Sequence, residues 1–472
     1  MSRRRTPKPN PTTSASAPQR TPAAEVAASK SPSRDRLDST LKLATILVAV
    51  AGLALSLHNF ADQRSTREMQ AELARAVAKA KLDKAWDLLG GRPLSEFVVG
   101  ETWNVNLDDI RAANDLIQEV KSTLPELLAP CLRLEACVLD ATGRPEEALT
   151  RLDQALAVAP ANVRIHLTRG AILDALGRDA DALQAYDRAI ALDPRFAAAH
   201  HNRGAVLYRL GRLEDALRAT DTALTLGLMD AQTHFNRGLA LQDLGRDEEA
   251  LAAHAAAIAR DPKHAPARRC RGVTLHRLGR DAEALVALDE SIALDGKHAL
   301  AHFHRGSVLF ALGRANEAVA AFETSLALDP TNAMACNNLG VAVKSLGRRE
   351  DALAAYDRAR ALDPRNTDAL HNRGTVLLEL GRPAEAVGAY DEILAIHGRN
   401  VHAHLGRGNA LLLAGRKEEA VAAYDAAIGI EPGNALAHRN RGIALFELGR
   451  AEEADVAHRR ARELDPSIPP RD

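Results

Sequence analysis

The feature that most constrains this chain is a glycine that recurs every 34 residues without an insertion. Its nine occurrences are Gly170, Gly204, Gly238, Gly272, Gly306, Gly340, Gly374, Gly408 and Gly442. Counting back one more interval reaches Ala136, in a degenerate first copy. A fixed period of this length is the signature of a repeat architecture. The sequence therefore predicts ten units over residues 129–468, numbered 1 to 10 below, with this glycine at position 8 of each unit.

Each unit is predicted to contain two helices. A Gly-Arg pair recurs ten times over residues 143–450, and glycine there suits a left-handed C-cap that ends the first helix. The second helix follows and closes at Asp-Pro or a variant of it, as at Pro194. Small residues lie seven positions apart in the second helix, as at Ala182 and Ala189. We expect them, with the glycine at position 8, to let the helix backbones approach closely. Such an approach would offset the helix-propensity cost of glycine, about 1 kcal/mol relative to alanine.

These features resemble the tetratricopeptide repeat, with a small residue at position 8, alanine at 20 and 27 and proline at 32. The resemblance covers about 340 of the 472 residues. It implies an all-α fold, an α-solenoid in which the units stack into a right-handed superhelix with a concave groove, because an isolated helix pair cannot bury its apolar face. Two positions depart from the family pattern. Position 7 is arginine in eight units, and position 4 is histidine in six, at His166, His200, His234, His302, His404 and His438.

The last unit differs from the others in its second helix. Positions 21 and 28 are aliphatic almost throughout, as in Leu217 and Leu224, but they are Asp455 and Arg462 in unit 10. A terminal repeat needs a polar outer face, because no further unit covers it. The sequence therefore predicts that the stack ends at unit 10.

The arginines at position 7 suggest a ladder of ion pairs. An acid at position 25 of one unit precedes an arginine at position 7 of the next at seven of nine junctions. The ladder is predicted from Asp153, Arg169, Asp187, Arg203, Asp221, Arg237, Asp289 and Arg305 and their later equivalents. At the ends, unit 1 has Glu135 at position 7 and unit 10 has Arg459 at position 25. We interpret the ladder as a device that sets the stacking register; the alternative is independent surface charge, since exposed pairs contribute only about 0–1 kcal/mol each. Ala255 and Leu339 interrupt it.

Position 6 suggests where a partner binds. It is asparagine at Asn202, Asn236, Asn338, Asn372 and Asn440. This resembles the asparagine ladder in the repeats of O-GlcNAc transferases, which implies a grip on the backbone of an extended peptide. An amide can both donate to and accept from a peptide bond. The alternative is a solvated helix residue, and the run is broken at Thr168, Cys270, His304 and Gly406.

Aromatic residues are expected to add apolar contact on the same concave face. They are Tyr208, Phe235, Phe303 and Phe310, with Phe446 in the last unit. Units 3 to 6 are therefore predicted as the main contact region, and core packing is the alternative for these rings. The Lys/Asn/Arg set with which some family members clamp a terminal carboxylate is not assembled here.

The chain before the repeats divides into three zones. Residues 1–40 are basic and rich in Pro, Ser, Thr and Ala, which predicts a disordered arm. Residues 41–60 carry no charge from Leu43 to Leu57, which predicts a membrane-anchor helix near the lower length limit of about 17 apolar residues. A cleaved signal over 41–57 and a buried helix are the alternatives. Residues 61–128 are predicted to be a helical lead-in with room for a short coiled coil, and residues 469–472 form a tail.

Charge and cysteine content bear on the compartment. Nine Lys and Arg precede the apolar core of 41–60, so the positive-inside rule places the N-terminus in the cytoplasm and the repeats outside it. The four cysteines are Cys131, Cys137, Cys270 and Cys336, without C-x-x-C spacing. We expect four free thiols and no metal site. Free thiols are unusual in an oxidising compartment, which weakens the assignment of sides.

The sequence favours binding over catalysis. No P-loop, nucleophile elbow, H-E-x-x-H or G-x-G-x-x-G follows a strand, and 61 Lys and Arg against 62 Asp and Glu argue against a nucleic-acid partner. We therefore expect no catalytic activity and no cofactor. We also expect no metal site, because the recurring histidines lie on different helix pairs. The predicted function is a membrane-tethered scaffold that binds a protein or peptide segment in the concave groove. The alternatives are a substrate adaptor for a separate catalytic chain, such as a transferase, and a secreted soluble repeat protein if 41–57 is a cleaved signal.

Overall fold

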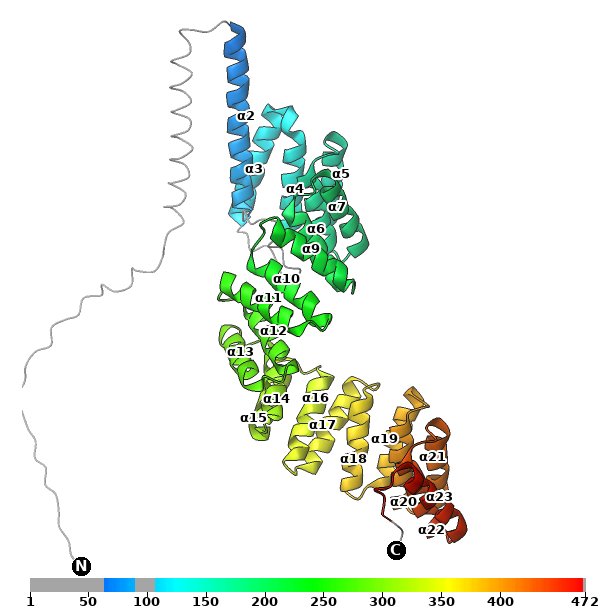
Figure 1. Ribbon diagram of the computed structural model, residues 1–472. Coiled ribbons are helices and arrows are strands. Elements are labelled where there is room, and N and C mark those ends of the chain that lie inside the picture. The colour runs from blue at the N-terminus through cyan, green and yellow to red at the C-terminus, as the bar shows by residue number, and fades with distance from the viewer. Residues whose placement is uncertain (1–62, 90–106, 470–472) are drawn as a thin grey trace, which may run out of the picture.

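A computed structural model describes residues 63–89 and 107–469, and every regular element in these ranges is helical (Figure 1). The predicted arm (1–40), the predicted membrane anchor (41–60) and most of the tail (470–472) lie outside the described residues. None of the helices within the described ranges is both long and apolar enough to cross a membrane.

Helices α4 to α23 form ten antiparallel pairs, one pair for each 34-residue unit. The first helices of the units are α4 (Leu128–Ala141), α6 (Val163–Ala175), α8 (Ala197–Arg209), α10 (Ala231–Asp243), α12 (Ala265–Arg277), α14 (Ala299–Ala311), α16 (Ala333–Ser345), α18 (Thr367–Glu379), α20 (Val401–Leu413) and α22 (Ala435–Glu447). The second helices are α5 (Pro145–Val158), α7 (Asp179–Leu192), α9 (Leu213–Thr225), α11 (Asp247–Arg260), α13 (Asp281–Leu294), α15 (Ala315–Leu328), α17 (Arg349–Leu362), α19 (Pro383–Ile396), α21 (Lys417–Ile430) and α23 (Ala451–Leu464).

The first helix of each unit ends at the glycine of the Gly-Arg pair. All ten of these glycines adopt a positive φ of 69–79°. In unit 2 the Gly177 N–H donates to the Asp174 carbonyl and the Arg178 N–H donates to the Leu173 carbonyl, both at 2.9 Å. These two hydrogen bonds form the Schellman motif, which satisfies carbonyls left free at a helix end. The predicted left-handed C-cap is therefore confirmed.

The glycine at position 8 packs against position 24 of its own unit. A Cβ placed on Gly340 would lie 2.5 Å from Cε1 of Tyr356, and rings occupy the equivalent space in seven of the nine glycine-bearing units. Only beside Gly204 and Gly272 is a carbonyl oxygen of the second helix among the nearest atoms, at 3.3 and 3.1 Å. The expectation that glycine serves mainly to let two backbones approach is thus corrected: in most units it makes room for a ring.

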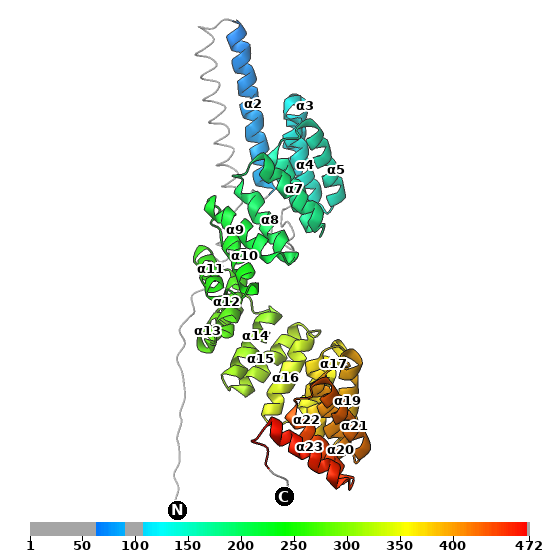
Figure 2. The same ribbon diagram turned by 45° about the vertical axis from the view of Figure 1, so that its right-hand side comes forward.

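The first helices line the inner side of the curve. Besides its partner and its neighbours in sequence, each first helix from α4 to α20 packs against the first helix of the next unit, whereas the described second helices show no comparable contact. Because equivalent elements lie closest together on the inside of a bend, the first helices form the inner face of the array. Figures 1 and 2 show an elongated, curved stack with α2 (Gln63–Leu88) near one end and α23 at the other.

The lead-in forms a cap on the first unit. Helix α2 packs against α3 (Leu107–Thr123), and both contact α4. Leu89, Ile117 and Leu134 are fully buried where these helices meet. A cavity of about 350 Å³ remains between α2 and α3. Within the described ranges, α2 therefore packs on its own chain's α3 and α4 instead of extending as a free coiled-coil strand.

The hydrophobic core is continuous at one end and divided in the middle. One cluster of buried side chains runs from Phe303 to Ala457, through units 6 to 10. Units 3 to 5 contain smaller clusters separated by buried polar groups, including His254 and the His201–Thr233 hydrogen bond of 2.7 Å. In unit 10, Asp455 and Arg462 are exposed on α23. A polar outer helix suits the end of a stack.

Candidate interaction surface

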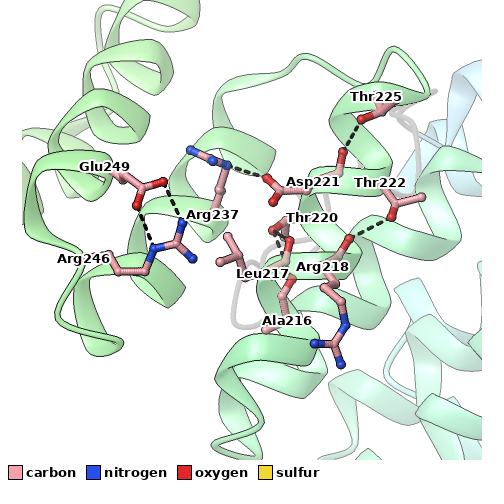
Figure 3. A network of polar contacts seen from close by, with 10 residues as sticks. All are labelled: Ala216, Leu217, Arg218, Thr220, Asp221, Thr222, Thr225, Arg237, Arg246 and Glu249. Atoms are coloured by element: carbon pink, nitrogen blue, oxygen red, sulfur yellow. Dashed lines mark hydrogen bonds and ion pairs between the residues drawn. The ribbon is translucent and has the colours of Figure 1, made fainter.

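Seven ion pairs join the second helix of one unit to the first helix of the next. The arginine Nε lies 2.5–3.1 Å from the aspartate Oδ1 in Arg169–Asp153, Arg203–Asp187, Arg237–Asp221, Arg305–Asp289, Arg373–Asp357, Arg407–Asp391 and Arg441–Asp425. Figure 3 shows the Arg237–Asp221 pair. The arginines are part-buried and the aspartates are exposed. These side chains are engaged with one another at the unit junctions, so we assign them to the stacking of the array and not to ligand binding.

A second set of ion pairs escaped the sequence analysis. The arginine of each Gly-Arg pair contacts the acid three residues later, in all ten units. The pairs are Arg144–Glu147, Arg178–Asp181, Arg212–Asp215, Arg246–Glu249, Arg280–Glu283, Arg314–Glu317, Arg348–Asp351, Arg382–Glu385, Arg416–Glu419 and Arg450–Glu453. The hydrogen bond from Arg246 lowers the pKa of the Glu249 carboxyl (Figure 3). A carboxylate in the first turn also suits the positive end of the helix dipole, and the recurring R-x-x-[DE] spacing was the available signal.

Five of the six histidines at position 4 contact the turn that precedes their own unit. His200 Nε2 lies 3.0 Å from the carbonyl oxygen of Pro194, six residues earlier. His166, His302, His404 and His438 make the same contact at 2.9–3.1 Å. Each ring therefore ties the start of a first helix to the turn that precedes it. These histidines are architectural, and within the described part of the chain no cluster of three or more His, Cys, Asp or Glu could hold a metal ion.

The asparagines at position 6 do not all face a ligand. Asn202 is buried, with only 5% of its surface exposed, which corrects its assignment as the leading ligand-binding group. Asn372 Nδ2 donates to Asn337 Oδ1 at 3.0 Å, across neighbouring units. Asn440 Nδ2 donates to Asn409 Oδ1, also at 3.0 Å. These bonds between first helices order the inner face and leave part of each amide for a partner.

The remaining two predicted asparagines are part-buried. Asn236 Oδ1 accepts from Gln232 Nε2 at 2.8 Å, and Asn338 Oδ1 accepts from Asn337 Nδ2 at 3.2 Å. The gap in the run at Gly406 has a steric cause, since the ring of Tyr390 occupies the space that a Cβ would need. The asparagines therefore do not form one continuous row.

The aromatic residues divide between core and surface. Phe235 and Phe303 are each 9% exposed and pack against other rings, His264 and Phe322 among them. Their prediction as surface contacts is wrong, because both rings are buried in the core. Phe310 is part-buried.

The exposed apolar side chains of the inner face lie nearer the C-terminus. Phe446 on α22 is 50% exposed, and Leu413 on α20, which the sequence analysis did not select, is 66% exposed. Tyr208 on α8 is part-buried and donates its hydroxyl to Asp243 Oδ2 at 2.7 Å. Within the described ranges, the exposed large apolar side chains of first helices therefore lie in units 6 to 10, at Leu300, Met334, Leu413, Leu436 and Phe446.

The four cysteines are free and buried. Burial raises the pKa of the Cys131 and Cys137 thiols to about 11. They are therefore protonated near neutral pH and serve as small core residues, since the thiolate is the reactive form.

Sequence profiles of known families match several stretches of the chain. A sequence profile described as tetratricopeptide repeat matches residues 201–265, 235–297, 337–400, 371–435 and 405–467, and one described as TPR repeat matches residues 172–211. The chain belongs to the tetratricopeptide repeat family. A profile described as bacterial transcriptional activator domain also matches residues 271–365 of this tetratricopeptide repeat protein, a stretch that consists of ordinary units from α12 to α17. None of these profiles is that of an enzyme.

Solved structures of repeat proteins are similar to parts of this tetratricopeptide repeat protein. A crystal structure of MamA is 24% identical and covers 34% of this chain and 94% of its own, with a TM-score of 0.33. MamA from Desulfovibrio magneticus RS-1 is 18% identical and covers 37% and 98%, with a TM-score of 0.35. YrrB, described as a TPR protein with an unusual peptide-binding site, is 22% identical and covers 47% and 96%, with a TM-score of 0.28. No curated protein matches the chain.

Proposed function

We propose that this protein is a scaffold whose inner face holds an extended segment of a partner protein. Tetratricopeptide repeats bind protein or peptide partners. The observation that carries the proposal is the exposure of Leu413 and Phe446 on successive first helices, α20 and α22. The Asn440–Asn409 bond joins the same two helices. Apolar anchors beside amides suit a segment that offers both side chains and backbone.

Site-specific photo-crosslinking tests the scaffold. A benzophenone amino acid replaces Phe446 or Leu413 in the full chain, expressed in its own host. The matched control positions are Val286 on α13 and Val456 on α23, which are 58% and 56% exposed but lie on second helices. We expect the same partner band from both inner positions and none from the outer ones. Equal crosslinking from inner and outer positions would overturn the assignment of the inner face, and a transferase in the inner-face band would favour the adaptor function.

We also propose that residues 41–60 tether the scaffold to a membrane, with the N-terminus in the cytoplasm and the repeats on the other side. Support comes from the uncharged run between Leu43 and Leu57 and the basic residues before it. The full chain should stay in the membrane pellet after an alkaline carbonate wash, and a deletion of 41–60 should move to the supernatant. Retention of the deleted chain would argue against the anchor.

The two sides of the membrane and the cleaved-signal alternative have separate tests. Protease is added on the side of the membrane that faces away from the cytoplasm. A tag at the N-terminus should be protected from it, whereas the repeats should be digested. Mass spectrometry of the mature chain checks for a new N-terminus after residue 57, which would make the protein a secreted repeat protein.

A further inference from the structure

Arg269 is an unusual cation on the inner face. Two other cations on first helices pair with carboxylates of the neighbouring unit: Arg277 Nε lies 3.3 Å from Asp247 Oδ2, and Lys344 Nζ lies 2.9 Å from Glu379 Oε1. Across the described ranges, no carboxylate lies within ion-pair distance of Arg269, and its Nε is buried without an acceptor. A partly buried guanidinium without a counter-charge is unfavourable and would be stabilised by an anion.

The groups around Arg269 come from several helices and are mostly basic. Its positive charge helps to lower the pKa of three histidines, which are His254 on α11, His298 at the start of α14 and His304 on α14. Burial is the larger cause in each case, and the pKa of His304 falls to about 4. The charge of Arg269 also acts to lower the pKa of Tyr208 on α8 and of Cys270 on α12, although burial raises both pKa values.

Two acids of the surrounding helices, Asp243 on α10 and Asp281 on α13, already have partners within the chain. Asp243 accepts from the Tyr208 hydroxyl. Asp281 lies 2.5 Å from Nδ1 of His276, another basic group that faces His304. These carboxylates are therefore not available to compensate Arg269.

The same helix faces offer apolar contact beside the charge. On α12, Arg269, Val273 and His276 are separated by four and three residues, so they share one face. Val273 is part-buried, as is Phe310 on α14, which occupies the position that His276 occupies on α12. A small inorganic ion would use only the charge, whereas a polypeptide segment would use both features.

We propose that Arg269 receives the side-chain carboxylate of an acidic segment of the partner protein, and that His304 takes up a proton when this segment binds. The inference rests on the proposed scaffold function and names the chemical class of its ligand. The carboxylate would accept hydrogen bonds from the guanidinium, which is the geometry that arginine favours. It would also stabilise the charged form of the neighbouring imidazole.

Fluorescence anisotropy with the full chain tests the charge requirement. The probe is a labelled dodecapeptide of alternating Glu and Ser with blocked ends, and its matched control has Gln in place of Glu. We expect the Glu peptide alone to bind, and Arg269→Ala to weaken binding by about tenfold or more, the usual effect of losing a charge-assisted hydrogen bond. Arg439→Ala is the matched variant, because Arg439 occupies the same position 5 in unit 10 and is exposed. Equal binding of both peptides, or equal losses in the two variants, would overturn the proposal.

Two further measurements separate this proposal from simpler ones. Binding of the Glu peptide should tighten several-fold from pH 7.5 to pH 5.5, and His304→Asn should flatten this dependence; an unchanged slope would refute the role of His304. Inorganic phosphate at equal concentration should compete poorly, and strong competition would show a general anion site instead. Crosslinks from Leu413 and Phe446 that persist while the Glu peptide fails to bind would reject the acidic ligand and leave the scaffold in place. Arg269→Ala should melt no lower than the unmodified chain, so a loss of binding is not a loss of fold.

Discussion

Lys121 of α3 and Glu135 of α4 form an ion pair, with 2.6 Å between Nζ and Oε1. Glu135 occupies position 7, where eight other units carry arginine, and the cation comes from the preceding helix. The pair therefore repeats the junction between units with its charges reversed. Gln118 Nε2 adds a bond of 2.9 Å to the same carboxylate. Helix α3 thus takes the place that a second helix would occupy in a unit before the first, which explains how the lead-in docks on the array.

Removing Lys121 should loosen this cap. Glu135 is only 7% exposed, so Lys121→Met leaves a buried carboxylate with weaker compensation, and we expect a loss of about 2 kcal/mol in the stability of the cap. Hydrogen exchange of α2 and α3 measures it. Lys79→Met, an exposed lysine of α2, should change little. The double variant Lys121→Glu with Glu135→Arg should recover most of the loss, and a failure to recover would show that the pair does not dock the cap.

The junctions between units should respond to charge reversal. Arg203 Nε and Asp187 Oδ1 are 2.6 Å apart, with the aspartate largely exposed. Reversing either residue alone should cost about 1 kcal/mol, because like charges then face each other across the junction. The double swap should restore the melting temperature. If it recovers nothing, the ladder is independent surface charge and has no part in setting register.

Position 8 should tolerate nothing larger than glycine where a ring faces it. In Gly340→Ala the new Cβ meets the buried Tyr356 ring, and overpacking of this kind costs about 1–3 kcal/mol even though alanine is the better helix former. Gly388→Ala in α19 is the control, because Gly388 is exposed and nothing lies within 4 Å of its added Cβ. That variant should gain up to about 1 kcal/mol. Thermal unfolding of both variants measures these changes. Similar shifts in melting temperature would contradict the packing role of Gly340.

Stability should fall in mild acid because of His254. This ring is fully buried, and neither of its nitrogens has a hydrogen-bond partner in the part of the chain that the structure describes. Burial first, then the charges of Arg269 and His264, lowers its pKa from 6.5 to about 4. Since the folded pKa lies below the unfolded one, the unfolded chain binds the proton more readily. Stability is therefore unaffected above about pH 6.5 and decreases as the pH falls from there towards 4.

The lowered pKa of His254 sets the size of this loss of stability. The loss across the window should be on the order of 3 kcal/mol, concentrated in units 3 to 5. His254→Tyr places the residue that other units carry at position 24, such as Tyr356, over Gly238. Urea unfolding between pH 7 and 4 should show a shallower decline for this variant. An identical decline in both chains would assign the acid sensitivity to another group, such as His304.

Several features of the fold could be predicted from the sequence because they depend on local chemistry. The left-handed glycine of each Gly-Arg pair follows from backbone sterics at a helix end, and the 34-residue period indicates one helix pair per unit. The polar residues Asp455 and Arg462 are exposed on α23 because no further unit covers this last helix. Each of these inferences needs only a residue type and its spacing.

Burial on the inner face could not be predicted in this way. Asn202, Phe235 and Phe303 lie on the expected helices, but the rotation of each helix about its axis turns them towards the interior. A shift of one position along a helix rotates a side chain by about 100°, so neighbouring positions 5, 6 and 12 have different environments. Spacing alone therefore identified the helix face only approximately, and Leu413 was missed.

By itself, the sequence determined the number of units, their helix ends and the order of charges along the ladder, because these are properties of a chain read one period at a time. Only the tertiary structure decided which side chain rests on each glycine, how Lys121 docks the lead-in on Glu135, and that Arg269 has no counter-charge among the described residues. Each of these depends on side chains from separate helices or units meeting in space, and the packing of one helix against another sets those meetings.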